Sequence, residues 1–138
     1  MAKSIREVMT KKPCSIDADK PVSYAAKMMR DEDVGIAPIV ERERLVGVLT
    51  DRDIAIRVVA EGRDPQQVRV HEVASSDVVT VDPQQDLDEA LRLMARHQVR
   101  RLPVVEEDGR LVGVVAQADV ARDADDKRTG EVVEKISK

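Results

Sequence analysis

The chain has 138 residues and a formal net charge of −4; 42% of its residues are hydrophobic and 36% charged, with one Tyr and no Phe or Trp. This length fits one ordinary domain or two small units that share a core, because a lone unit of about 65 residues buries too little surface to be comfortably stable. The nearly balanced charge argues against DNA or RNA as a partner. With one Tyr as its sole aromatic residue, the chain is expected to hold any planar ligand with aliphatic side chains and Met.

The first ten residues, MAKSIREVMT, lack the apolar stretch of a signal peptide. No run in the chain approaches the roughly 20 apolar residues of a membrane span. Cys14 is the only cysteine, so no internal disulfide is possible, which agrees with a reducing compartment. We therefore expect a soluble, cytoplasmic protein without a membrane partner.

In chain order, the first half predicts a short strand near residues 14–16 and a helix over 21–32. The segment APIVERERLVGVL follows, rich in Val, Ile and Leu around a polar turn, as a β-hairpin requires. A second helix is predicted over 52–61, and Gly62 and Pro65 end it. The first half thus reads β-α-β-β-α.

The second half repeats this order, with a strand near 78–81, helices over 86–97 and 117–126, and the hairpin segment LPVVEEDGRLVGVV between them. An offset of 65 residues aligns the halves, and one extra residue in the second hairpin turn shifts the offset to 66, where repeats tolerate a length change. We expect an α/β fold of two repeats, 1–65 and 66–138, packed through their sheets with pseudo-twofold symmetry. The aligned identical pairs are Glu7 and Glu72, Val8 and Val73, Asp17 and Asp82, Ala25 and Ala90, Met29 and Met94, Pro38 and Pro103, Val40 and Val105, Gly47 and Gly113, and Asp53 and Asp119.

The third strand of each repeat ends in a polar pattern, with Thr50 and Asp53 in the first copy and Ala116 and Asp119 in the second. One interpretation is a capping box, in which Thr50 caps the next helix and Asp53 reaches back to its backbone N–H. Ala116 has no hydroxyl, so only half of that box is present in the second repeat. A carboxylate in a first helical turn is favourable by itself, so the retained Asp119 favours a ligand role only modestly.

The Gly-x-x-Thr-x-x-Asp ending of the third strand, the LPVV-type second strand and the tandem repeat together resemble the CBS-domain pair, or Bateman module, over nearly the whole chain. The order of motifs is similar to small stand-alone bacterial CBS-pair proteins of the hypoxic-response type. The resemblance implies two copies that face each other through their sheets, clefts that bind adenosine-containing ligands, and pairing of two chains into a disc.

On this resemblance, Asp53 would accept hydrogen bonds from both ribose hydroxyls, and Thr50 with the helix N-terminus would hold a phosphate. Asp119 would serve the second cleft in the same way. The resemblance also places the residues before the second strand at the mouth of a cleft. These are Arg100 and Arg101, whose guanidinium groups match phosphate oxygens, although both would reach one ligand only if they precede the regular strand. Solvated arginines at a strand edge are the alternative.

The resemblance also implies a cleft position for Ile36, which aligns with Arg101. It further implies that the first strand of each repeat presents its backbone and small side chains to the edge of the adenine. These strand residues are Cys14, Ser15 and Ile16 in the first repeat, and Val79, Thr80 and Val81 in the second. A strand backbone would serve structure and ligand equally here, and Cys14 is expected to be a buried small residue. The remaining candidates have structural interpretations: solvated or locally bonded histidines for His71 and His97, and core methionines for Met28, Met29 and Met94.

The function expected is a regulatory module that senses an adenosine ligand, AMP, ADP, ATP or S-adenosylmethionine, by changing shape, with no cofactor required. The alternative is a ligand-free structural or protein-interaction module. An enzyme is disfavoured because the sequence lacks a phosphate-binding loop, a dinucleotide motif and a recognisable nucleophile with its histidine; a metal site has no ligand spacing to support it.

A homodimer is expected because the predicted helix from residue 52 carries more apolar width than one small core needs, with Ile54, Ile56, Val58 and Val59 within two turns. No effector domain is recognisable in the sequence, so an effector is expected to be a separate protein, whose identity the sequence does not indicate.

Overall fold

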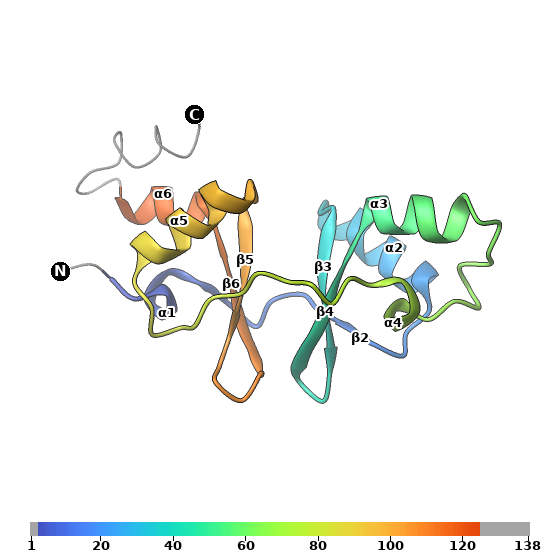
Figure 1. Cartoon of the computed structure of the whole chain (residues 1–138), viewed down its shortest axis with the longest axis horizontal. Coiled ribbons are helices and arrows are strands. Elements are labelled where there is room, and N and C mark those ends of the chain that lie inside the picture. Colours follow the sequence, from blue (N-terminus) through green and yellow to red (C-terminus); the bar gives the residue numbers. More distant parts are fainter. Residues whose placement is uncertain (1–2, 125–138) are drawn as a thin grey trace. The chain divides into compact units, whose positions relative to one another are not determined.

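A computed structural model of the chain describes residues 3–124, which form two compact units (Figure 1). The middle unit consists of residues 14–78. The terminal unit joins residues 3–13, at the start of the chain, to residues 79–124. The chain therefore passes from the terminal unit into the middle unit and back again.

The middle unit is a three-stranded sheet with helices. Strand β2 runs parallel to β3, and β3 pairs antiparallel with β4, which gives the sheet order β2-β3-β4. The elements are β2 (Ile16–Asp17), α2 (Val22–Glu32), β3 (Ile36–Glu41), β4 (Arg44–Thr50), α3 (Asp51–Ile54), the π-helix η1 (Ala55–Val59) and α4 (Val70–Val73).

The terminal unit also has a three-stranded sheet, in the order β1-β6-β5, and both pairs of named strands are antiparallel. Its elements are α1 (Ile5–Val8), β1 (Thr10–Lys11), α5 (Leu87–His97), β5 (Arg101–Val105), β6 (Leu111–Ala116) and α6 (Gln117–Ala124). The predicted helices over 21–32 and 86–97 are confirmed to within one residue at their starts. The strand predicted near 78–81 is reduced to one parallel bridge between Val81 and Val104.

Equivalent residues of the two repeats make equivalent contacts. Ile16 pairs with Ile39 in the middle unit as Val81 pairs with Val104 in the terminal unit. The α/β repeat predicted from the sequence is therefore confirmed. Each unit has its own aliphatic core, in which Met29 and Met94 are buried as predicted and Met28 is partly buried against the first. The fully buried hydrophobic residues, with 0% of their surface exposed, are Ile16, Val22, Ala25, Ile39, Leu49, Val58 and Val70 in the middle unit, and Ile5, Ala90, Val104 and Val115 in the terminal unit.

The segments that open each repeat, residues 3–13 and 68–78, pack against the other repeat's elements and are called the exchanged segments below. In the terminal unit the N–H of Ile5 donates to the carbonyl of Gln85 at 2.8 Å. In the middle unit the N–H of Val70 donates to the carbonyl of Lys20 at 2.9 Å, the equivalent bond. Each repeat's opening segment thus completes the core that contains the other repeat's sheet. The repeat boundary at residue 65 stays a prediction, since packing units and sequence repeats divide the chain differently.

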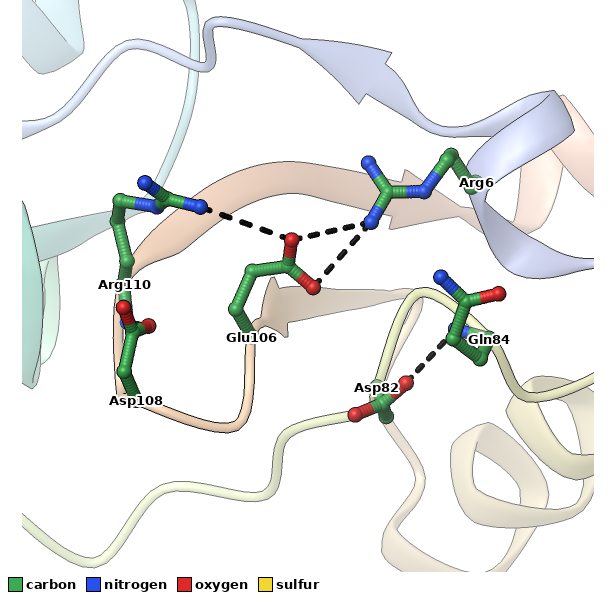
Figure 2. Close-up of polar contacts among 6 residues, drawn as sticks. All are labelled: Arg6, Asp82, Gln84, Glu106, Asp108 and Arg110. Atoms are coloured by element: carbon green, nitrogen blue, oxygen red, sulfur yellow. Dashed lines mark hydrogen bonds and ion pairs between the residues drawn. The ribbon is translucent and has the colours of Figure 1, made fainter.

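An ion-pair cluster fastens the first exchanged segment to the β5–β6 hairpin (Figure 2). Arg6, on α1, donates through Nη2 to both carboxylate oxygens of Glu106, at 3.2 and 3.1 Å. Arg110, across the turn, lies 3.7 Å from Glu106 Oε2. The equivalent of Arg6 in the middle unit is His71, which lies instead 4.0 Å from Asp19 Oδ1. The charge cluster therefore belongs to one unit and not to the repeat.

Candidate functional site

The junction of β4 and α3 holds the strongest sequence candidates, and its geometry is a complete capping box. Thr50 has an extended backbone, with φ −109° and ψ 161°, and its hydroxyl accepts a hydrogen bond from the N–H of Asp53 at 3.0 Å. Asp53 Oδ2 accepts in return from the N–H of Thr50 at 3.0 Å. The capping interpretation of this pair is therefore confirmed, while ligand contact by the same residues stays a prediction.

The junction of β6 and α6 has only one of the two capping-box hydrogen bonds, because Ala116 has no hydroxyl to accept the other. Asp119 Oδ2 accepts from the N–H of Ala116 at 3.1 Å, and Arg122 Nη2 donates to Oδ1 at 2.5 Å. Asp119 is the one charged residue among the described residues classed as buried, with 9% of its surface exposed. Both of its oxygens are thus already engaged.

The two carboxylates differ in what they leave free. Asp53 Oδ1 has no hydrogen bond among the described residues, and its nearest cation is Arg57 Nε at 3.8 Å, which is ion-pair distance and not a hydrogen bond. Asp119 Oδ1 is held by a direct guanidinium bond. Asp53 Oδ1 therefore offers a ligand an acceptor with no hydrogen bond to the described residues, whereas Asp119 Oδ1 already accepts one from Arg122.

The arginines proposed to contact phosphate lie at the start of β5, in the terminal unit. Arg100 precedes the strand, and its carbonyl accepts from the N–H of Gln117 at 2.8 Å, whereas Arg101 is already in the strand, paired with Ala116. Both are exposed, and neither side chain has a hydrogen bond or ion pair within residues 3–124. Both arginines were expected to reach one ligand only if both preceded the regular strand. Arg100 precedes it and Arg101 does not, so this condition is not met for the pair.

The aligned positions in the middle unit begin β3. The carbonyl of Gly35 accepts from the N–H of Asp51 at 2.9 Å, and Ile36 pairs with Thr50 and is exposed. Ile36 therefore lies beside the capping box on the adjacent strand. Its exposed side chain is compatible with the ligand contact predicted for it.

The first-strand candidates divide by burial. Ile16 and Val81 have their side chains in the two cores, and Val79 is half-buried. The backbone of Val81 is also engaged, since its N–H donates to Pro103 and its carbonyl accepts from Val105. Cys14 corrects the sequence prediction: it is exposed and not buried, because β2 begins only at Ile16 and Cys14 precedes the residues that enter the core.

The sequence of the chain matches a described domain family twice. The sequence model of the CBS domain matches residues 5–60 and 70–126. CBS domain-containing protein YhcV of Bacillus subtilis is 43% identical over 118 residues, which are 86% of this chain and 83% of that protein. Hypoxic response protein 1 of Mycobacterium tuberculosis is 41% identical over 118 residues, 85% of this chain and 82% of that protein.

Solved structures share the fold. A crystal structure of Hypoxic Response Protein I with two coordinated zinc ions has a TM-score of 0.77 and 40% identity, covering 87% of this chain and 98% of that one. The complex of CBSX2 with AMP has a TM-score of 0.75 over 88% of this chain and 95% of that one, but at 24% identity it shows the fold alone. A match to an inosine-5′-monophosphate dehydrogenase of Korarchaeum cryptofilum covers only 22% of that enzyme.

The described residues contain no cluster of side chains that could form a zinc site. Among residues 3–124 no group of three or more His, Cys, Asp or Glu side chains lies together as a zinc site requires. Within the same residues no helix is both long and apolar enough to cross a bilayer.

Proposed function

The chain belongs to the CBS-domain family, as a tandem pair, and we propose that it is a sensor that binds an adenosine-containing ligand at the β4–α3 junction. CBS pairs of this kind are regulatory modules and not enzymes, and the dehydrogenase match is confined to a small part of that enzyme. A regulatory module works by binding its ligand with different affinity in two conformations, so it needs no catalytic group.

The observation that carries the proposal is the unsatisfied acceptor of Asp53. One oxygen of this carboxylate is fixed by the backbone of Thr50, which orients the side chain, and the other has no hydrogen bond among the described residues. A carboxylate offers acceptors and no donors, which suits the two adjacent hydroxyls of a ribose. Oδ2 keeps a second lone pair, so the capping bond and a ribose bond are compatible.

The adenine nucleotides AMP, ADP and ATP are the ligands proposed first, with S-adenosylmethionine second. The CBSX2 complex with AMP, which has this fold, supports the adenosine class. Arg100 or Arg101 is proposed to supply a phosphate contact, since both are exposed and neither side chain has a partner among residues 3–124. Asp119 would serve a second, weaker site, because Arg122 already occupies its outer oxygen.

The proposal extends to assembly and location. We propose a homodimer, which would cover the exposed apolar residues of η1. A cytoplasmic location fits the free cysteine, and a separate effector protein would respond to the ligand-bound state. A ligand-free interaction module is the second candidate, and one observation favours it: the capping box accounts for Thr50 and Asp53 without any ligand.

A thermal-shift panel separates these candidates. The purified chain is heated with AMP, ADP, ATP, S-adenosylmethionine, NAD or zinc, each tested in turn. A ligand present at about a hundred times its dissociation constant adds about 2.7 kcal/mol to the stability, enough to raise the melting temperature by several degrees. A response to adenosine compounds supports the sensor, whereas no response to any of them supports the interaction module.

A further inference from the structure

One side chain of the middle unit touches both the candidate ligand site and the second exchanged segment. Arg57, on η1, lies 3.8 Å through Nε from Asp53 Oδ1. Through Nη1 the same guanidinium donates to the carbonyl of Val73, the last residue of α4, at 3.2 Å. Two nitrogens of one rigid, planar group therefore join the carboxylate to the exchanged segment.

We propose that Arg57 is a positioning residue that links the state of Asp53 to the packing of residues 68–78. This inference rests on the proposed function, because it concerns what a ligand on Asp53 would change elsewhere. Hydroxyls bound to Asp53 would fix its carboxylate, which would hold Arg57 against Val73 and tighten the exchanged segment. That segment continues directly into residue 79 and the terminal unit, so it is one of the two covalent connections through which the state of the middle unit can reach the rest of the chain.

The terminal unit is built differently at the equivalent place. There two different residues make the contacts to the carboxylate and to the exchanged segment. Arg122 pairs with Asp119, and Asp123, which is the counterpart of Arg57, pairs with Lys3 at 2.7 Å. Among the described residues Arg122 pairs with Asp119 alone. Among the contacts of residues 3–124, one side chain, Arg57, joins the ligand-site carboxylate of the middle unit to its exchanged segment, whereas Arg122 of the terminal unit contacts the carboxylate of Asp119.

The secondary structure differs at the same point. The middle unit's helix changes from α to π at residue 55, with the N–H of Ala60 donating to the carbonyl of Ala55 at 2.9 Å. In the terminal unit α6 is an α-helix from Gln117 to Ala124. Single π turns are rare and often accompany functional sites, and here the π turn contains Arg57.

Hydrogen exchange measured by NMR tests the link without any ligand. The reporters are the amides of Ala74, which donates to Val70, and Ser75, which donates to Val48; the amide of Ala18, bonded to Val40, reports opening of the whole unit. Arg57→Met should speed exchange at the two reporters about fivefold relative to Ala18, the effect of losing about one hydrogen bond. Arg52→Met is the matched control, since Arg52 is on the same helix and its side chain has no bond to the described residues.

A double-mutant cycle then decides whether Asp53 acts through Arg57. Asp53→Asn should speed exchange at the reporters when Arg57 is present and add nothing when Arg57→Met is already in place. Equal effects of Asp53→Asn in both backgrounds would overturn the link, as would unchanged reporters in Arg57→Met.

Added AMP tests the ligand dependence. In the parent, AMP should slow the reporters more than the amide of Ala18, and in Arg57→Met it should bind, as calorimetry checks, without that extra protection. The same protection in both proteins would contradict the inference. If the parent binds no adenosine compound, the proposed function fails, and the ligand-free cycle still decides the Asp53–Arg57 link.

Discussion

The repeated glycines Gly47 and Gly113 mark the points where an exchanged segment passes close to a hairpin strand. A Cβ at Gly47 would lie 2.6 Å from the carbonyl oxygen of Ser75, and one at Gly113 would lie 2.9 Å from that of Thr10. Ser75 and Thr10 are equivalent residues of the two exchanged segments. The first residue of the Gly-x-x-Thr-x-x-Asp pattern is therefore set by packing, whatever its last residue binds.

Replacing Gly47 with Ala should destabilise the protein by about 1–3 kcal/mol, because the new methyl group meets backbone that must shift. Gly35→Ala is the control, since the nearest atoms to its Cβ belong to the side chain of Asp51, 3.1 Å away, which can move. Urea unfolding measures both. Equal stability of the two variants would contradict the packing explanation.

Completing the second capping box should stabilise the terminal unit. In Ala116→Thr a hydroxyl would accept from the N–H of Asp119, as Thr50 does from Asp53, for a gain of about 1 kcal/mol. Thr50→Ala is the mirror variant and should lose about as much. Thermal unfolding of both variants checks the prediction, which fails if Ala116→Thr gives no gain while Thr50→Ala shows the usual loss.

Sequence spacing was enough to predict the capping box, because both partners lie within four residues of each other. The burial of Cys14 was predicted wrongly, because one residue decides whether the chain has yet entered the strand. Arg57 was missed for another reason: its partner Val73 is 16 residues away and contributes a backbone carbonyl, which no side-chain pattern reveals.

At the scale of elements, the short helices α1 and α4 begin the exchanged segments and tie them to their units. Glu72 accepts from the N–H of Arg69 at 2.7 Å and pairs with Arg63 at 3.0 Å. The hydrogen bond from the Arg69 backbone is the largest cause that lowers the pKa of Glu72 below its ordinary 4.5, and Arg63 adds to it. α4 is thus stabilised by an ionised carboxylate at its first turn.

The stability that Glu72 contributes should be pH-dependent. Because its folded-state pKa lies below the unfolded value of 4.5, the contribution is present above that pH and is lost as the pH falls through the lowered pKa. Glu72→Gln should therefore be less stable than the parent at pH 7, with the difference shrinking in acid. Urea unfolding at pH 7 and at a pH below the lowered pKa of Glu72 measures this difference in stability, with Glu61→Gln as an exposed control. A difference that does not shrink in acid would refute the assignment.

The helices and hairpins were predictable because hydrophobic periodicity and turn residues are local signals. The exchange of the opening segments was not. Alignment of the repeats shows that residues 6–17 are equivalent to 71–82. Because the two segments are alike in sequence, the alignment does not indicate which of the two units each segment packs into. Only the long-range bonds, such as that from Ile5 to Gln85, decide which unit each segment completes.

At the scale of the whole molecule, η1 exposes apolar side chains that a partner would cover. Val58 is fully buried, but Ile56 and Val59 are 45% and 66% exposed. We expect a homodimer in which these residues are buried, since a symmetric pair is the commonest assembly. Light scattering at micromolar concentration should give twice the chain mass, and Val59→Asp should shift the mass toward the monomer; a parent that is monomeric at every concentration would contradict the prediction.

Calorimetry with AMP tests the central claim most directly, provided that circular dichroism shows each variant to be folded. Ribose hydrogen bonds to a carboxylate are worth about 1.5–3 kcal/mol each, so Asp53→Ala should weaken AMP binding at least about tenfold, while Asp119→Ala should change the stronger site little. Affinity and not melting temperature is the readout, because Asp53 also caps α3. A folded Asp53→Ala variant that binds AMP as the parent does would contradict the account.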